Sequence, residues 1–355
     1  MTTPGTPPPG SSGPGSSAPP DGSSSSGSSA PGSSGSGSSS PASRARSAWR
    51  GARAQEIALP LVVILLVVIG TILKGTVFFS TANLWNVLVQ ASVAGTVAVG
   101  MTFVIATGGI DLAVGSVLAA AAIIGGHYFH GAGSAWFMLG TIAAAVAFGV
   151  VNGLAVAWLR IVPFVATIAM LAAARGVAQQ ISHQTPVALY DLEALTKIGS
   201  LRVLGVPIPA IVFIIVVALG WLVLNRTRYG RYVIAVGGNR EAARIAGIRV
   251  RPIQFSVYVL VGLCTGIASV LQTGQLASAS PVVGLGLELD AIAAVVIGGT
   301  SLAGGRCSMI GTLFGVLTFA LIFNLLTLEN VQSHVQQILR GVIILGAVAV
   351  QRRGH

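Results

Sequence analysis

The chain has 355 residues, of which 53% are hydrophobic and only 8% are charged, and its mean hydropathy is +0.84. Because a soluble domain carries about 25% charged residues, this composition excludes an ordinary water-soluble fold of this size. A net charge of +11 is compatible with nucleic-acid binding, but the arginines lie at the ends of apolar runs, and that placement indicates membrane topology instead.

Residues 1–43 differ in composition from the rest of the chain. They consist mainly of Gly, Ser and Pro, with Asp21 as the only charged side chain. Such a segment buries too little apolar surface to offset the entropy of ordering it, so we expect a disordered cytoplasmic tail. It lacks the charged start and apolar core of a signal peptide. We assign it no chemistry, with a role as a tether as the alternative, and expect residues 44–355 to form a separate transmembrane domain.

Apolar runs of about 20 residues recur along the rest of the chain, and each is long enough to cross the roughly 30 Å hydrocarbon core of a bilayer. The expected spans are 57–74, 85–107, 112–130, 135–158, 164–182, 208–225, 253–273, 289–305, 308–328 and 335–350. We therefore expect an all-α integral membrane protein, a polytopic bundle of about ten transmembrane helices with Gly-rich breaks. Abundant Gly and Ala predict close helix packing.

The basic residues orient this bundle. With the amino terminus inside, fifteen arginines fall on the cytoplasmic side, whereas only Lys74, Lys197 and Arg202 fall outside. Since Lys and Arg resist translocation, both termini are expected in the cytoplasm.

Seven arginines lie from Arg226 to Arg251, in a segment that this orientation places in the cytoplasm. Within it, Glu241 and the two alanines that follow favour a helix, and Gly247 comes where such a helix would stop. We expect a short amphipathic helix near 238–248, presented to a soluble partner. Glu-Ala-Ala occurs in many helices, but with a Gly four residues on it resembles the coupling-helix signature of bacterial ABC importer permeases, which docks on the ATPase subunit. The Ile-x-Leu-Pro of the fuller signature is absent.

Two Gly-rich segments, 107–116 and 298–306, interrupt the apolar pattern, and both fit Gly-Gly-x-x-Leu-Ala-x-Gly, which suggests an internal repeat. Glycine pairs allow a helix to break, but a break at membrane depth is tolerated only where it is buried in protein or lines a cavity. Asp111 has two readings. It lies beside the translocation path or gate, where an ionised group needs a partner or water, or it is the N-cap of the span that starts at Leu112.

Neutral polar residues within the spans suit a pathway for an uncharged, hydroxyl-rich solute, although Asn and Gln also join helices to one another. These residues are Asn86, Gln90, Asn152, Asn324, Gln336 and Gln337. Arg175 and Arg340 lie within spans and are expected either to extend towards the membrane surface or to pair with an acidic residue such as Glu329.

Several longer motifs, in the same order, resemble the ribose-type branch of ABC importer permeases. They are Gly100-Met101-Thr102, the run 107–116, Pro163-Phe164-Val165-Ala166-Thr167, Tyr229-Gly230-Arg231-Tyr232, the run 235–239, Glu241-Ala242-Ala243 and the run 289–302. The resemblance covers about residues 57–350. Cys307 after Arg306 departs from the Gly that is frequent in the family.

The resemblance implies an import system in a bacterial cell membrane. Two permease chains would form the pathway, two ATPase subunits would hold the helices around Glu241, and a substrate-binding protein would deliver a monosaccharide such as ribose, xylose or galactose. The ATPase-coupling residues are then expected to be Gly238, Asn239, Glu241, Ala242, Ala243, Arg244 and Gly247. The candidate pathway or gate residues are Asn86, Gln90, Thr107, Gly108, Gly109, Asp111, Ser116, Asn152, Gly298, Gly299, Thr300, Ser301, Asn324 and Gln337.

The chain itself carries no recognisable catalytic set. A P-loop needs Gly-Lys-Ser or Gly-Lys-Thr, and the only lysines, Lys74 and Lys197, do not follow a glycine. We therefore expect ATP and Mg²⁺ on a separate ATPase subunit, and no cofactor, metal or nucleic acid on this chain. Cys264 and Cys307 lack metal-type spacing. The histidines, at span ends, in loops or at the terminus, are His127, His130, His183, His334 and His355.

Two alternatives remain open at this point. The same scaffold could carry another small solute, such as a nucleoside or a furanose signal molecule, because a binding protein would largely set the choice. An ion-coupled secondary transporter would need acidic or basic relays inside the membrane, for which the candidates are Asp111, Arg175 and Arg340.

Overall fold

The computed structural model describes residues 41–353 and divides into two units, the first ending at Ala45 and the second starting at Arg46. The helical bundle is the second unit. Residues 1–40, and with them most of the expected tail, lie outside the described residues, as does His355. The expectation of a disordered tail stays a prediction.

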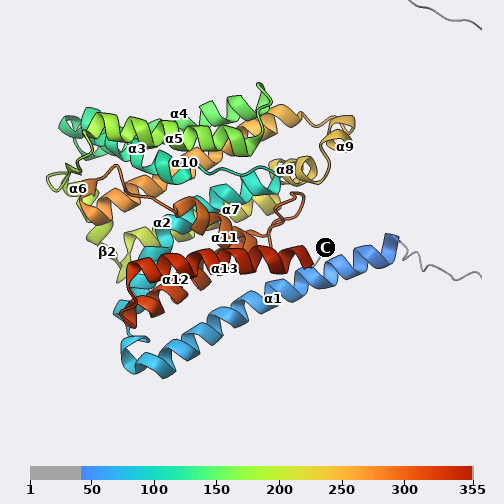
Figure 1. The fold of residues 1–355 in the computed structure, drawn as a ribbon, viewed down its shortest axis with the longest axis horizontal. Helices are drawn as coiled ribbons and strands as arrows, with labels where there is room; N and C mark the ends of the chain where they lie inside the picture. Colours follow the sequence, from blue (N-terminus) through green and yellow to red (C-terminus); the bar gives the residue numbers. More distant parts are fainter. Residues whose placement is uncertain (1–40, 354–355) are drawn as a thin grey trace, which may run out of the picture. The chain divides into compact units, whose positions relative to one another are not determined.

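Helices account for most of the described chain (Figure 1). In order they are α1 (Pro41–Lys74), η1 (Gly75–Val77), α2 (Thr81–Ala106), α3 (Val114–Tyr128), η2 (His130–Ala132), α4 (Ser134–Ala157), α5 (Pro163–Ser182), α6 (Glu193–Ser200), α7 (Ile208–Arg226), α8 (Arg228–Gly238), α9 (Arg240–Ile245), α10 (Val250–Leu276), α11 (Leu287–Ile297), α12 (Met309–Leu328) and α13 (Ser333–Arg353). Four two-residue strands complete the set: β1 (Val187–Ala188), β2 (Arg202–Val203), β3 (Val206–Pro207) and β4 (Ser278–Ala279).

Seven helices within the described residues are long and apolar enough to cross a membrane, and they belong to α1, α2, α4, α5, α7, α10 and α12. The other three expected spans correspond to shorter or more polar helices. α3 has 15 residues, α11 has 11, and α13 has 21 but is interrupted by polar side chains such as Gln337 and Arg340. The expected span 289–305 is helical only to Ile297, because the chain turns at Gly298 and Gly299 (φ +87°) and remains irregular up to α12. The all-α, multi-pass class is confirmed, whereas the count of ten and the orientation stay predictions.

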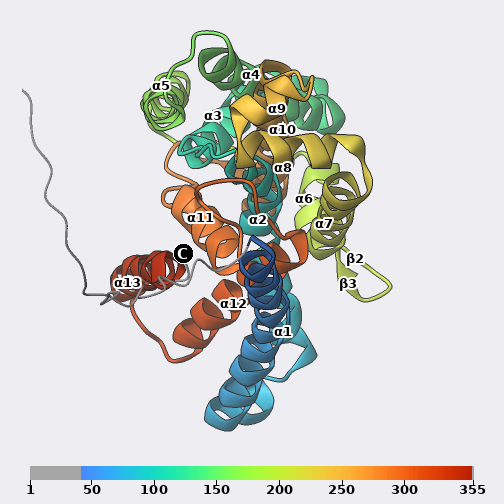
Figure 2. The same ribbon diagram turned by 90° about the vertical axis from the view of Figure 1, so that its right-hand side faces the viewer.

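α2 is the central helix of the bundle. In its most apolar 18-residue window 78% of the residues are buried, against 11% in α1 and 22% in α5. It contacts α7, α10, α11 and α12 (Figure 2). The expected close packing is clearest between α4 and α10, where a Cβ on Gly149 would lie 3.1 Å from the Cα of Gly262, and the reverse holds at Gly262. Small residues let these two backbones approach in a way that larger side chains would prevent.

The two ends of the bundle differ in character. At one end α8 and α9 carry exposed arginines (Figure 1, right), and we call this the basic end. At the other end lie α6 and the hairpin of β2 and β3 (Figure 1, left), while β1 pairs antiparallel with β4. Large apolar side chains stay exposed along α1, α5 and α7, for example Ile72 at 78% and Phe164 at 52%. A helix surface of this kind suits lipid or a second chain rather than water.

Candidate functional site

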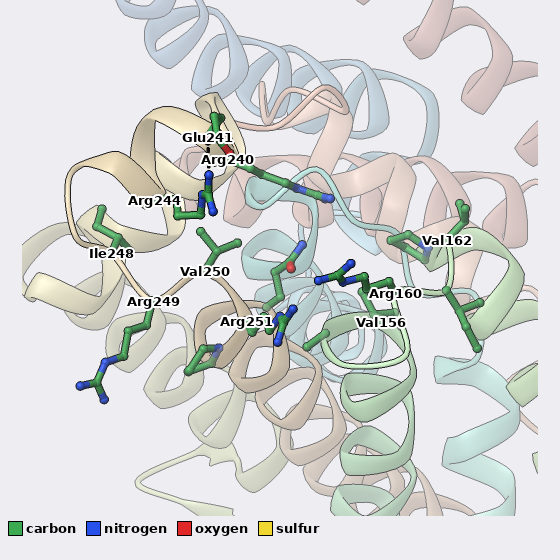
Figure 3. Close-up of a pocket in the computed structure, with 15 residues that line it drawn as sticks. Val156, Arg160, Val162, Arg240, Glu241, Arg244, Ile248, Arg249, Val250 and Arg251 are labelled. Carbon is green, nitrogen blue, oxygen red and sulfur yellow. Dashed lines mark hydrogen bonds and ion pairs between the residues drawn. The ribbon is translucent and has the colours of Figure 1, made fainter.

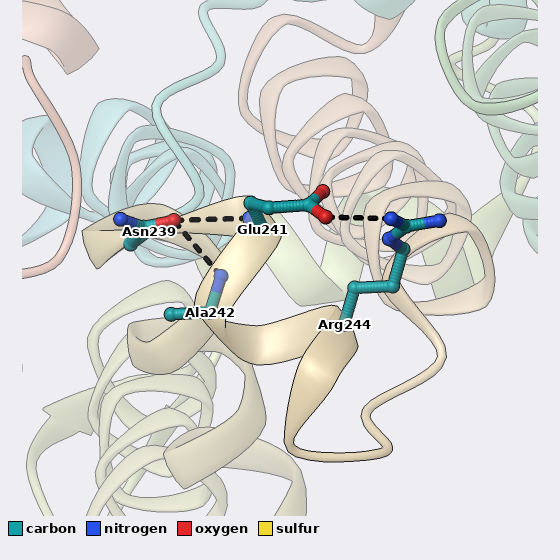
Figure 4. Close-up of polar contacts among 4 residues, drawn as sticks. All are labelled: Asn239, Glu241, Ala242 and Arg244. Carbon is teal, nitrogen blue, oxygen red and sulfur yellow. Dashed lines mark hydrogen bonds and ion pairs between the residues drawn. The ribbon is translucent and has the colours of Figure 1, made fainter.

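The segment after α7 folds into two short helices, each with its own polar cap. The Thr227 hydroxyl accepts the Gly230 N–H at the start of α8 (3.3 Å). At the start of α9 the Asn239 Oδ1 accepts the N–H groups of Glu241 and Ala242, both at 3.0 Å (Figure 4). An Asn cap of this kind satisfies helix donors that have no partner within the helix.

The end of α9 is equally well defined. Gly247 has φ +81°, its N–H donates to the Arg244 carbonyl, and the Ile248 N–H donates to the Ala243 carbonyl, both at 3.0 Å. This pair of bonds is a Schellman motif, which favours Gly at the left-handed position. The expected short helix near 238–248 is therefore present as Arg240–Ile245, whereas α8 was not expected from the sequence.

α9 presents a mixed charged and apolar surface. Glu241 and Arg244 are exposed and form an ion pair across one turn (Figure 4). Ala243 faces inwards at 4% exposure, while Ile245 is 80% exposed. Sequence reasoning missed Ile245. A large apolar side chain that is exposed among arginines, at the end of a short capped helix, is a candidate contact for a protein partner.

A broad pocket of about 1020 Å³ lies beside α9, between the end of α4, the start of α5 and the start of α10. We call it the basic pocket because its lining includes Arg160, Arg240, Arg244, Arg249 and Arg251. Figure 3 shows Arg160 and Arg251 directed towards the same space, whereas Arg249 points away from it. The pocket thus brings an arginine of the α4–α5 connection next to the arginines around α9.

Four glycines and one carbonyl join α8 to the centre of the bundle, and we call this contact the glycine junction: Ala106, Gly108, Gly237, Gly304 and Gly305. The Gly305 N–H donates to the Ala106 carbonyl at the end of α2 (3.0 Å). A Cβ on Gly237 would collide with the same carbonyl and lie 2.7 Å from the Gly305 nitrogen. A Cβ on Gly304 would lie 2.8 Å from the Gly108 nitrogen. The two Gly-rich breaks therefore meet each other and the end of α8, two residues before α9.

Asp111 lies in the first break and is 3% exposed. Its Oδ1 accepts the Ala113 N–H at 2.9 Å, and the side chain of Asn152 from α4 lies beside it. The N-cap reading needs a correction, because α3 begins at Val114 and its N-cap position is Ala113. Asp111 instead hydrogen-bonds within the loop that precedes α3. The two candidate residues Asp111 and Asn152 are neighbours.

Other polar residues of the two breaks are buried and bonded locally. The Thr107 hydroxyl donates to the Val104 carbonyl (2.8 Å), and the Thr300 hydroxyl accepts the Ser308 N–H (3.4 Å). Gly109, Ser116, Gly298 and Ser301 are also buried, while Gly299 is half-buried. This group lies around the glycine junction and the start of α3 and α12.

The amide residues do not gather in one place. The Asn324 side chain forms a reciprocal pair with Asn83, with N–O distances of 2.9 and 3.0 Å, so it joins α12 to α2. Gln336 donates to the Val331 carbonyl at 2.8 Å. Asn86, Gln90 and Gln337 are exposed in the single chain. Asn83 was missed because its partner lies 241 residues away in the sequence.

A smaller cavity of about 130 Å³ lies between α2, α11, α12 and α13, and Gln90 lines it. Two further lining residues, Asp290 and Arg340, form an ion pair with an Oδ1–Nε distance of 2.9 Å. Arg340 thus pairs with an acidic residue, which was one of the two alternatives expected, but the acid is Asp290, whereas Glu329 pairs with Lys74 (3.0 Å). Arg175 donates to the carbonyls of Pro281 and Val283.

Within the described residues, no group of three or more His, Cys, Asp or Glu side chains is placed to hold a metal ion. What the site offers is a capped, protruding helix at the basic end, a tight contact from the preceding helix α8 to α2, and a cavity with both polar and apolar lining further along α2. The fold is that of a multi-pass membrane protein whose basic end presents a short, capped helix.

Comparison with known proteins agrees with this class. The family described as the permease component of a branched-chain amino acid transport system matches residues 83–348. The chain is 41% identical over 317 residues to the ribose import permease of Escherichia coli (strain K12), covering 86% of this chain and 95% of that protein. It is 39% identical to the ribose import permease of Bacillus subtilis (strain 168), covering 81% and 90%. It is 37% identical to the galactofuranose transporter permease of Escherichia coli (strain K12), covering 78% and 81%.

The chain therefore belongs to this family of transport permease components, in the ribose-type branch of ABC importer permeases.

Proposed function

We propose that the chain is the membrane-spanning subunit of an ABC importer for a monosaccharide in a bacterial inner membrane. α9 is the element on which a separate ATPase subunit docks, so ATP and Mg²⁺ bind to that subunit. A soluble binding protein delivers the sugar at the end that carries α6, and two copies of this chain enclose the pathway. Similarity to sugar permeases along most of the chain supports the class, and α9 itself supports the docking role.

The observation that carries the docking role is the exposure of Ile245 at the end of a helix that is capped on both sides. Burying an Ile side chain in an interface is favourable by about 1.5–3 kcal/mol. Around it, Arg240 and Arg244 offer donors to carboxylates on the partner. A rigid, amphipathic tip of this kind fits a groove on a soluble subunit.

The glycine junction supports the transmission of movement from that subunit. Only Asn239 separates α9 from Gly238 at the end of α8, and Gly237 packs without a side chain between Ala106 and Gly305. A displacement of α9 therefore reaches the ends of α2 and of the second Gly-rich break through backbone contact, which does not depend on side-chain rotamers. A rigid-body shift of this kind suits alternating access.

The substrate class rests on the relatives. The family description names branched-chain amino acids, but the similar permeases quoted above, with 37–41% identity over most of their length, are named for sugars. A monosaccharide is therefore the better assignment, with an amino acid, a nucleoside or another furanose as competitors to be tested.

The test is uptake by the complex reconstituted in proteoliposomes with its ATPase and binding protein. We expect ATP-dependent accumulation of labelled D-ribose or D-galactose and none of L-leucine or adenosine. Accumulation of L-leucine or adenosine alone would contradict the substrate class. Uptake without the ATPase, driven by an ion gradient and abolished by an uncoupler, would contradict the ABC mechanism.

A further inference from the structure

We propose that the cavity between α2, α11, α12 and α13 binds one neutral, polyhydroxylated solute during its passage, with Gln90, Asp290 and Arg340 as its polar contacts and Phe319 and Phe323 as its apolar wall. This inference rests on the proposed function and names the place in the chain where the sugar is held. No residue of this cavity other than Gln90 was expected on the pathway.

The polar side of the cavity has hydrogen-bonding capacity that the protein does not use fully. Asp290 Oδ1 and Arg340 Nε are 2.9 Å apart and both atoms are shielded from solvent, so the contacts left for a solute are those of the second carboxylate oxygen and the terminal guanidinium nitrogens. Gln90 lies opposite on α2, with an exposed side chain. A carboxylate accepts, a guanidinium donates, and an amide does both, so the set matches vicinal hydroxyl groups.

The apolar side consists of two phenylalanine rings. Phe319 and Phe323 lie one turn apart on α12, with ring centroids 5.8 Å apart, and the Arg340 guanidinium lies 4.9 Å above the Phe323 ring. Binding sites for small molecules commonly combine such aromatic walls with a few placed polar groups. A sugar ring offers C–H groups on its faces and hydroxyls at its rim, and it therefore presents both kinds of surface.

The charges within the cavity favour a neutral occupant. Asp290 and Arg340 are only 19% and 26% exposed in their side chains, and each is the counter-ion of the other. An anion or a cation would leave one of them unpaired in a partly buried place, which is unfavourable. The volume of about 130 Å³ is enough for several waters or a small solute, since one water needs about 10–15 Å³.

The depth of the cavity is also suitable for a transport intermediate. Gln90 precedes Ala106 by 16 residues on the same helix, which corresponds to about 24 Å at 1.5 Å per residue. The cavity thus lies well away from the glycine junction, towards the end that carries α6. Transporters hold their solute between two gates in this way.

The experiment measures protection of an introduced thiol in the reconstituted transporter. In a chain with Cys264→Ala and Cys307→Ala, shown to retain uptake, Gln90→Cys is labelled with a methanethiosulfonate reagent during turnover, with and without D-ribose or D-galactose. Gln180→Cys, exposed on α5 and outside the cavity, is the matched control. Ala94→Cys, on the cavity wall, repeats the test at a second position in case the first variant folds poorly.

We expect the sugar that the complex accumulates to slow labelling at positions 90 and 94 severalfold and to leave position 180 unchanged. Equal labelling with and without that sugar, in a complex that still accumulates it, would overturn this inference and leave the proposed function standing. Protection by L-leucine instead would overturn it in favour of a zwitterionic occupant. Failure of the proposed function itself would be visible earlier, as absence of sugar uptake by the unmodified complex.

Discussion

Gly237, one residue before the end of α8, packs against the carbonyl oxygen of Ala106, the last residue of α2. The same carbonyl accepts the Gly305 N–H at 3.0 Å, so the segment before α9, the central helix and the second Gly-rich break share one contact. The contact consists of backbone atoms, which makes it sensitive to a single added methyl group.

A Gly237→Ala substitution should therefore impair transport. Its Cβ would collide with the Ala106 carbonyl, and overpacking of this kind costs about 1–3 kcal/mol. Gly176→Ala, in α5, is the matched control, because its Cβ would meet nothing within 4 Å. Melting temperature and ATP-driven sugar uptake of the two variants provide the measurement. Equal uptake and equal melting temperatures would refute the assigned role of the junction.

The cap of α9 gives a second prediction. Asn239→Ala removes the acceptor for the Glu241 and Ala242 N–H groups and should destabilise the helix by about 1 kcal/mol. Asn239→Asp keeps an acceptor and should behave as the unmodified chain. The readout is the affinity for the purified ATPase subunit, which we expect to fall about fivefold for the first variant. Identical affinities for both variants would show that the cap is irrelevant to docking.

The Asn83–Asn324 pair should stabilise the bundle rather than serve the solute. Either Asn83→Leu or Asn324→Leu should lower the free energy of unfolding in detergent by about 0.6–1.7 kcal/mol. The double variant should cost less than the sum, because the two amides satisfy each other. Asn86→Leu, exposed one turn along α2, is the control for the chemical change. Strict additivity would mean that the two amides are not coupled.

Acid should loosen the connection between η2 and the segment that precedes α6. His130 Nε2 lies 2.8 Å from Asp191, and this hydrogen bond holds the pKa of Asp191 below its usual range. A carboxyl with a depressed folded pKa contributes stability above its unfolded pKa of about 3.9 and loses that contribution as pH falls through the folded value. The difference in melting temperature between the unmodified chain and Asp191→Asn should thus be present at about pH 5–6 and vanish well below about pH 4. A difference in melting temperature that grows as the pH falls would contradict this prediction.

Hydropathy and charge were sufficient to predict the class, the Gly-rich breaks and the position of the short basic helix. They are not sufficient to predict a helix that is short, or a helix end that carries small residues instead of charged ones. α8 was not predicted, because its arginines directly follow the long apolar helix α7. α11 was predicted as a full span, because Gly298 and the residues after it are small rather than charged.

Contacts between segments that are distant in the chain could not be predicted from the sequence alone. Nothing near Asn324 indicates Asn83, and nothing near Arg340 distinguishes Asp290 from the nearer Glu329 as its partner. The caps of α9 were accessible in principle, since Asn before a charged turn and Gly after it are ordinary helix-boundary signals. The exposure of Ile245 depends on which face of α9 packs inwards, and six residues are too few to predict that face.

The most direct test of the central claim is co-purification of the chain from its native membrane in mild detergent, followed by mass spectrometry and an ATPase assay. We expect a P-loop ATPase subunit to accompany the unmodified chain and to be lost from Ile245→Asp. It should be retained by Leu204→Asp, which introduces the same charge at a 99% exposed apolar residue at the opposite end. A chain that purifies without any ATPase, under conditions that preserve other membrane complexes, would contradict the account.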